Sequence, residues 1–157
     1  MIACFVVNLD GDIPQTLLLR RASHDAYSPG TWQMVYGHRD ENETPELTVL
    51  REVAEETGLQ VSELYTLDET LIFYDIVYKC MQLTPIFVAV VDSKRAIRLD
   101  LGEHTDYEWV DFGPARQMLA WPSQRRALDQ LAELLVNGGL PAIMRLDISK
   151  SEIASEK

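Results

Sequence analysis

Short apolar runs rich in β-branched and aromatic residues alternate along this chain with turn-forming clusters and with two longer segments of helical periodicity. The runs at residues 2–8 and 16–22 flank the turn sequence DGDIPQ, and this pattern predicts a β-hairpin. Residues 31–37, "TWQMVYG", predict one further short strand. The stretch from Leu64 to Val91 predicts two or three strands, and "YEWVDF" predicts another.

Two helices are predicted from apolar spacing and from the residues at their ends. The first has Thr44 as its N-cap and Pro45 at its first position, and it should stop at Gly58. The second begins at Pro122, carries leucines at helical spacing and stops at the Asn-Gly pair at 137–138. Strands and helices joined by connections of mixed length predict an α/β fold, a sandwich with a mixed β-sheet and helices on both sides.

The domain organisation follows from chain length and from the C-terminal composition. At 157 residues the chain is long enough for one domain with a core of its own. We expect that domain to span residues 1–148, and we expect residues 149–157 to form a polar tail that frays. The chain shows no internal repeat and no low-complexity segment.

Composition and charge narrow the class of partners. With 46% hydrophobic and 25% charged residues, the composition is that of an ordinary soluble globular protein. The formal net charge of −11 disfavours non-specific attraction to nucleic acid or to anionic lipid, so neither partner is expected. Cys4 and Cys80 lack metal-site spacing and are interpreted as reduced thiols. With no signal-peptide pattern and no membrane span, a cytoplasmic location is expected.

The first predicted helix concentrates negative charge. A helical wheel of residues 45–57 groups Leu47, Leu50, Val53, Ala54 and Thr57 on one side, and roughly opposite them Glu52, Glu55 and Glu56. Packing against a sheet should then leave all three carboxylates facing outward together. They could form a solvated acidic face, or in a cleft they could require a cation. Because no His or Cys is near them in sequence, Mg²⁺ or Mn²⁺ is favoured over zinc, and phosphate chemistry is its natural use.

The spacing around this helix resembles the signature of a known family. Reading from Gly37, five residues precede Glu43, and seven more precede Arg51-Glu52. An aliphatic residue, an alanine, the pair Glu55-Glu56, then threonine, glycine and another aliphatic residue follow. This arrangement matches the Nudix box at every defining position, and the chain resembles the Nudix hydrolases. The resemblance implies an α/β/α sandwich and metal-dependent hydrolysis of a nucleoside diphosphate linked to another group.

The resemblance also implies roles for individual residues. Glu52, Glu55, Glu56 and the backbone carbonyl of Gly37 would hold Mg²⁺, with Mn²⁺ as a substitute, while Arg51 would orient the carboxylates. Glu43 would steady the loop before the helix. The base that takes the proton from water is left open between Glu52 and Glu103, and Glu103 is also a candidate auxiliary metal ligand. His104 could assist, or it could be a surface or locally bonded histidine.

Substrate contacts are expected just before the box and in the central strands. Arg20 or Arg21 could clamp a phosphate, although a solvated charge is the alternative for each. Trp32, Phe73 and Tyr74 could stack on a base or pterin ring, or could pack in the core.

The segments "TWQMVYGH", "LIFYD" and "EHTDYEWV" look most like bacterial dATP or dihydroneopterin triphosphate pyrophosphohydrolases. The expected partner is therefore a small nucleotide or pterin polyphosphate, cleaved to release pyrophosphate. Sugar nucleotides, dinucleoside polyphosphates, capped RNA and a non-catalytic nucleotide-sensing module are the alternatives. A homodimer is left open.

Overall fold

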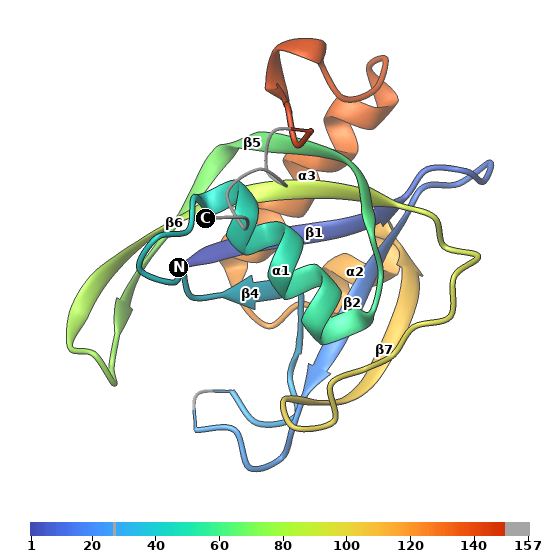
Figure 1. The fold of residues 1–157 in the computed structure, drawn as a ribbon. Helices are drawn as coiled ribbons and strands as arrows, with labels where there is room; N and C mark the ends of the chain where they lie inside the picture. The colour runs from blue at the N-terminus through green and yellow to red at the C-terminus, as the bar shows by residue number, and fades with distance from the viewer. Residues whose placement is uncertain (27, 150–157) are drawn as a thin grey trace.

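The computed structural model describes residues 1–26 and 28–149, which form a mixed sheet between helical layers (Figure 1). The elements in chain order are β1 (Ile2–Asn8), β2 (Gln15–Arg21), β3 (Trp32–Gln33), β4 (Val35–Gly37), α1 (Pro45–Thr57), β5 (Val61–Asp75), β6 (Cys80–Val91), β7 (His104–Asp111), α2 (Phe112–Met118), α3 (Pro122–Val136), the 3₁₀ turn η1 (Ala142–Met144) and β8 (Arg145–Leu146). The strand order in the sheet is β3-β2-β1-β6-β5-β8, with β4 also paired to β1 and β7 to β2. Among these eight strands only the β1–β6 pair is parallel.

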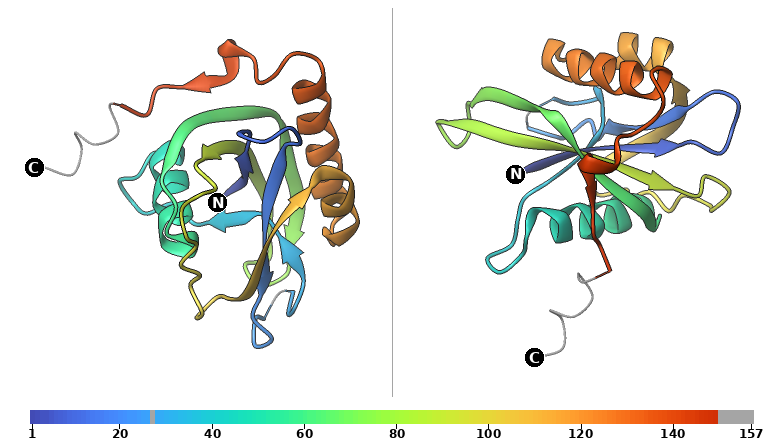
Figure 2. Two further views of the ribbon diagram at one scale, coloured as in Figure 1. Left: turned by 90° about the vertical axis from the view of Figure 1, so that its right-hand side faces the viewer. Right: turned by 90° about the horizontal axis from the view of Figure 1, so that it is seen from above.

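The sheet is buried on both faces around β1. Alternate residues of a strand point to opposite faces, and β1 divides its side chains accordingly. Ala3, Phe5 and Val7 pack toward α2 and α3, whereas the residues between them pack toward α1. Figure 2 shows α3 on one side of the sheet and α1 on the other. The expected α/β sandwich is confirmed, and a nearly continuous apolar strand is the pattern that burial on both faces requires.

Helix α1 begins and ends where its capping residues predict. The Thr44 hydroxyl accepts a hydrogen bond from the backbone N–H of Leu47 at 3.4 Å. Gly58 adopts φ 71°, and its N–H donates to the Ala54 carbonyl at 2.9 Å. A left-handed residue at this position is sterically free only for glycine, so the helix has defined ends at both sides of the acidic segment.

Local pattern was less informative about two other elements. The single strand expected at 31–37 is two short strands, because Trp32–Gln33 pairs with β2 while Val35–Gly37 pairs with β1. Helix α2 was not predicted, since it is short and begins with the sequence Phe-Gly-Pro. The region 64–91 forms two strands, β5 and β6. Residues 150–157 of the predicted tail lie outside the described residues. None of the described helices has the length and apolar character needed to cross a bilayer.

Candidate functional site: a carboxylate cluster at the end of α1

Helix α1 is rotated relative to the orientation that the helical wheel predicted. Its buried residues include Val49, Val53 and Glu56, which lie at helical spacing on one stripe, whereas Ala54 is exposed. Glu56 is only 3% exposed. The expectation that all three carboxylates face outward was therefore wrong for Glu56. The wheel averages hydrophobicity and cannot register that a carboxylate has a polar partner inside the protein.

Arg51 organises the acidic side chains at the surface of α1. Its Nη1 donates to Glu55 at 2.8 Å and lies 2.9 Å from Glu52 Oε1, so one nitrogen pairs with both carboxylates. Its Nε donates to Glu43 Oε1 at 2.9 Å, and its Nη2 donates to the His38 carbonyl at 2.9 Å. One guanidinium thus joins three carboxylates and the loop that leads into the helix.

Glu43 connects that loop to the helix, as the sequence suggested. Its carboxylate accepts hydrogen bonds from the Thr48 hydroxyl at 2.9 Å and from the Asp40 backbone N–H at 3.3 Å. The bond from Arg51 is the largest cause of a lowered pKa for Glu43, so the ionised form is the stable one. The loop 38–44 is consequently held against α1 by charge-assisted bonds.

Glu52 lies directly over the end of β4. A Cβ atom added at Gly37 would overlap the Cγ, Cδ and Oε1 atoms of Glu52. Glycine is needed at position 37 because the Glu52 side chain approaches its backbone closely. The backbone conformation is not the reason, since the φ of Gly37 is not in the left-handed region. Burial raises the pKa of Glu52, against the opposing effect of Arg51. The backbone of Gly37 and the Glu52 carboxylate therefore share one small region.

Glu56 has a partner that is distant in sequence. His104, 1% exposed at the start of β7, places its Nε2 3.0 Å from Glu56 Oε2. Burial raises the pKa of Glu56 to about 7, with the hydrogen bond from His104 opposing that shift and the charges of Glu103 and Glu52 adding to it. His104 is not a surface histidine, because its side chain is buried and bonded to Glu56 of the acidic helix. A direct role for His104 in hydrolysis stays a prediction.

The loop between β6 and β7 brings Glu103 to the same place. The Arg98 N–H donates to the Thr57 carbonyl at 2.8 Å, and the Asp100 N–H donates to the Glu56 carbonyl at 3.0 Å. From the other side, the Ala22 N–H donates to the Glu103 carbonyl at 2.8 Å. These backbone bonds fix the loop between the end of α1 and the end of β2.

The result is a compact group of ligand atoms. One carboxylate oxygen each from Glu56 and Glu103 and one ring nitrogen of His104 all lie within 4.8 Å of one another. We call Glu52, Glu56, Glu103 and His104 the carboxylate cluster. A buried acid with a raised pKa beside two further carboxylates is a site that a cation would stabilise, and oxygen ligands suit a hard divalent ion. The residues therefore fit a divalent metal. Sequence reasoning named His104 only as a group that could assist, and it did not predict the contact with Glu56, because 48 residues separate the two.

The arginines proposed to contact substrate have structural partners. The Arg20 Nε donates to the Gly30 carbonyl at 3.1 Å. Arg21 forms an ion pair with Asp25 and donates to Gln33 at 3.2 Å. Both side chains therefore hold the connection between β2 and β3, and Arg21 lies opposite His104 in the β2–β7 register. Their role as phosphate clamps stays a prediction.

The three aromatic candidates do not form one stacking surface. Trp32 packs against the core on the α3 side of the sheet. Phe73 and Tyr74 are neighbours in β5, so their side chains leave opposite faces of the strand. At most one of these two could therefore stack on the same ring. A substrate role for any of them stays a prediction.

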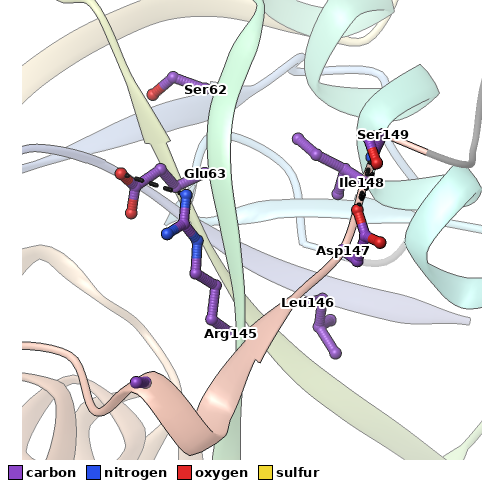
Figure 3. A pocket seen from close by; sticks show the side chains of 8 residues that line it. Ser62, Glu63, Arg145, Leu146, Asp147, Ile148 and Ser149 are labelled. Carbon is purple, nitrogen blue, oxygen red and sulfur yellow. Dashed lines mark hydrogen bonds and ion pairs between the residues drawn. The ribbon is translucent and has the colours of Figure 1, made fainter.

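A hollow elsewhere on the protein does not include the carboxylate cluster. It has a volume of about 530 Å³ and lies between β5 and the segment that follows η1. Figure 3 shows Arg145 reaching Glu63, a 3.6 Å ion pair, with Asp147 across the hollow. The acidic side chains outnumber the single arginine in this lining, which is unfavourable for a polyphosphate.

Comparison with known proteins is consistent with this geometry. The model of the NUDIX domain matches residues 1–131. An RNA pyrophosphohydrolase of Aeromonas hydrophila is 30% identical over 149 residues, covering 82% of this chain and 81% of that protein. An isopentenyl-diphosphate Delta-isomerase of Salmonella paratyphi B is 27% identical over 130 residues, covering 76% of this chain and 66% of the isomerase. A crystal structure described as a NUDIX hydrolase from Listeria monocytogenes superimposes with a TM-score of 0.76 at 25% identity, covering 90% of this chain and 97% of that one.

Proposed function

This chain belongs to the Nudix family as a hydrolase of phosphorus anhydrides, and we propose that it cleaves the pyrophosphate bridge of a nucleoside or pterin triphosphate with Mg²⁺. The observation that carries this proposal is the carboxylate cluster, in which Glu52 and Glu56 of α1 meet Glu103 of the loop before β7, with Glu52 lying against Gly37. A solvated acidic face would not require a carboxylate as deeply buried as Glu56.

The proposed metal ligands are Glu52, Glu55, Glu56 and the carbonyl of Gly37, with Glu103 as an auxiliary ligand. Arg51 supports this assignment, because it bonds both Glu52 and Glu55 and so limits where their oxygens can lie. A bound divalent cation would neutralise charge on the polyphosphate and lower the pKa of an attacking water. His104 would hold the buried Glu56 in place through its 3.0 Å contact.

Glu103 is the better candidate for the base that takes the proton from water. It is exposed, and no Arg or Lys forms an ion pair with it among the described residues, whereas Glu52 lies 2.9 Å from Arg51. As the water oxygen bonds to phosphorus, the bridging P–O bond breaks, the leaving phosphate takes its electron pair, and Glu103 takes the proton. Glu52 then serves mainly as a metal ligand.

Glu103→Gln is expected to lower kcat roughly 10- to 100-fold with little change in KM. This is the low end of what a positioned base supplies, because Glu52 stands nearby. Steady-state kinetics on the preferred substrate measures the effect. The matched control is Glu108→Gln, an exposed glutamate of the same strand region, which should keep wild-type rates. If the two variants are equally active, Glu103 is not the base.

The substrate is expected to be a dNTP or dihydroneopterin triphosphate. The net charge of −11 is unfavourable for a long polyanion such as RNA, although an RNA pyrophosphohydrolase is among the relatives. A mononucleotide or pterin compound, whose few charges a bound cation can neutralise, suits the cluster better. Because one relative is an isopentenyl-diphosphate isomerase, a direct assay must distinguish hydrolysis from isomerisation.

A screen for released phosphate products tests the proposal. Purified protein with Mg²⁺ should release pyrophosphate from at least one dNTP or from dihydroneopterin triphosphate, and EDTA should stop the reaction. Sugar nucleotides, dinucleoside polyphosphates, triphosphorylated RNA and isopentenyl diphosphate are the comparison substrates. Hydrolysis in H₂¹⁸O then locates the attacked phosphorus. Preference for RNA, or isomerisation without anhydride cleavage, would contradict the substrate assignment.

A further inference from the structure

The outer part of the β5–β6 hairpin extends beyond the rest of the sheet (Figure 1). Strand β6 pairs with β1 only from Ile86 to Val90, and β5 pairs with β8 only at Leu64 and Tyr65. Within the described part of the chain, residues 70–75 and 80–85 therefore pair only with each other. We call residues 70–85 the outer hairpin. Its two edges carry main-chain N–H and C=O groups that no neighbouring strand satisfies.

One face of the outer hairpin carries a group of four exposed, largely apolar side chains. Ile72 lies opposite Leu83, and Tyr74 lies opposite Met81, so these four side chains stand together on the same face. Each is between 58% and 68% exposed. The opposite face is different, because Leu71, Asp75 and Thr84 are buried there. We call the exposed group the apolar quartet, and it consists of Ile72, Tyr74, Met81 and Leu83.

The exposed apolar surface continues around the tip of the hairpin. Ile76, Val77 and Tyr78 are 69%, 53% and 61% exposed. A monomeric protein rarely exposes a contiguous apolar patch larger than a few hundred Å², and seven large side chains in one hairpin exceed that. A stable interface of standard size buries roughly 800 Å² on each partner, which a patch of this size can approach. The outer hairpin therefore has the size and composition of an interface.

The distribution of charge favours a second copy of this chain over an anionic membrane as the partner of the outer hairpin. The protein carries a net charge of −11, yet residues 70–85 contain only Asp75 and Lys79 as charged side chains. Asp75 is buried and accepts bonds from the backbone N–H groups of Val77 and Tyr78. Two copies that meet through this hairpin therefore bury few charged side chains, whereas an anionic membrane would face the repulsion of the whole protein.

We propose that the apolar quartet and the tip of the outer hairpin form the interface of a symmetric dimer of this chain. A two-fold axis brings the same patch of both copies together, so a single apolar face is its own complement. The unpaired edges of the hairpin can add main-chain hydrogen bonds between the copies. This dimer does not depend on the proposed hydrolysis, since the quartet includes none of the carboxylate cluster.

Sedimentation analysis over a range of protein concentrations tests the dimer. The wild-type protein should reach twice its monomer mass of 17.9 kDa at micromolar concentration. Ile72→Glu should remain at the monomer mass at those concentrations, because it places a charge in the quartet of each copy. The matched control is Ile143→Glu, which changes the same residue type at a site 93% exposed outside the hairpin and should stay dimeric. Circular dichroism of each variant checks that the fold is retained.

A spin label provides a second readout that does not alter the quartet. Cys80 is exposed, and the buried Cys4 should not react. Cys80 lies opposite Asp75 in the strand register, so its side chain is on the face of the hairpin away from the quartet. A label on Cys80 therefore leaves the quartet free. The dimer predicts a defined distance between the labels of two copies, which Ile72→Glu should abolish.

A wild-type protein that stays monomeric at 100-fold higher concentration overturns the proposal, as does a dimer that Ile72→Glu leaves intact. Monomer that instead binds neutral phosphatidylcholine vesicles overturns it in favour of a lipid surface.

Discussion

Glu56→Gln is expected to abolish hydrolysis and, in metal-free protein above pH 7, to make the fold more stable than the wild type. The loss of rate should be at least about 10³-fold, because the variant removes a charge from the proposed metal site and weakens transition-state stabilisation by several kcal/mol. The gain in stability has a separate cause. Glu56 is 3% exposed, and ionising it without a cation is unfavourable in the folded state.

The direction of the pH dependence follows from the raised pKa. The folded protein holds the Glu56 proton up to about pH 7, while the unfolded chain releases it near the ordinary value of 4.5. Between these values the folded state binds more protons, so the free energy of unfolding falls as pH rises. The difference between the two pKa values corresponds to roughly 3 kcal/mol in the free energy of unfolding. This stabilisation is fully present below pH 4.5 and is lost by about pH 7. Glutamine does not titrate and should not show this loss.

Urea unfolding in EDTA at pH 5 and pH 8 measures the effect. The two proteins should have similar stability at pH 5, and at pH 8 the variant should be more stable by roughly 1–3 kcal/mol. Mg²⁺ should then raise the stability of the wild type and leave the variant nearly unchanged. Glu133→Gln, on the exposed side of α3, is the control and should differ from wild type in neither property. Retained turnover in Glu56→Gln would remove Glu56 from the proposed site.

Gly37→Ala is expected to lower kcat by at least about 10²-fold while leaving the fold intact. The new methyl group would occupy the space of the Glu52 side chain, which must move away from the end of β4. A misplacement of about 1 Å in a catalytic group can cost this much rate. The backbone itself accepts alanine, because the φ of Gly37 is not positive. The folding penalty should therefore come from displacing the Glu52 side chain and be roughly 1–3 kcal/mol.

Gly113→Ala is the matched control for this substitution. Apart from its two chain neighbours, no atom lies within 4 Å of a Cβ at Gly113, and the residue is in helix α2. Alanine there should leave the rate unchanged, and its effect on stability should be small, because the gain in helix propensity is opposed by the contact of the new Cβ with Pro114. Kinetics and urea unfolding on the two variants separate a steric effect at Glu52 from a general effect of losing glycine. Wild-type kinetics in Gly37→Ala would show that Glu52 is not held against β4 during turnover.

Local chemistry made the acidic helix predictable from sequence. Thr44 and Gly58 cap it because hydrogen bonding and a left-handed conformation act over a few residues. Arg51 meets Glu55 because residues four apart are neighbours on a helix. The strand pattern likewise predicted a mixed sheet with helices on both sides. The division of residues 31–37 between two partners was not predictable, since strand pairing is a long-range choice.

By itself, the sequence determined the ends of α1, the spacing of its glutamates and membership of the Nudix family, all of which depend on neighbours along the chain. Only the tertiary structure decided that Glu56 points inward to His104, that Gly37 lies beneath Glu52, and that no strand among the described residues borders the outer hairpin. The physical reason is that helical spacing sets which side chains share a face, whereas the rotation of that face and its partners are set by packing against strands distant in the chain.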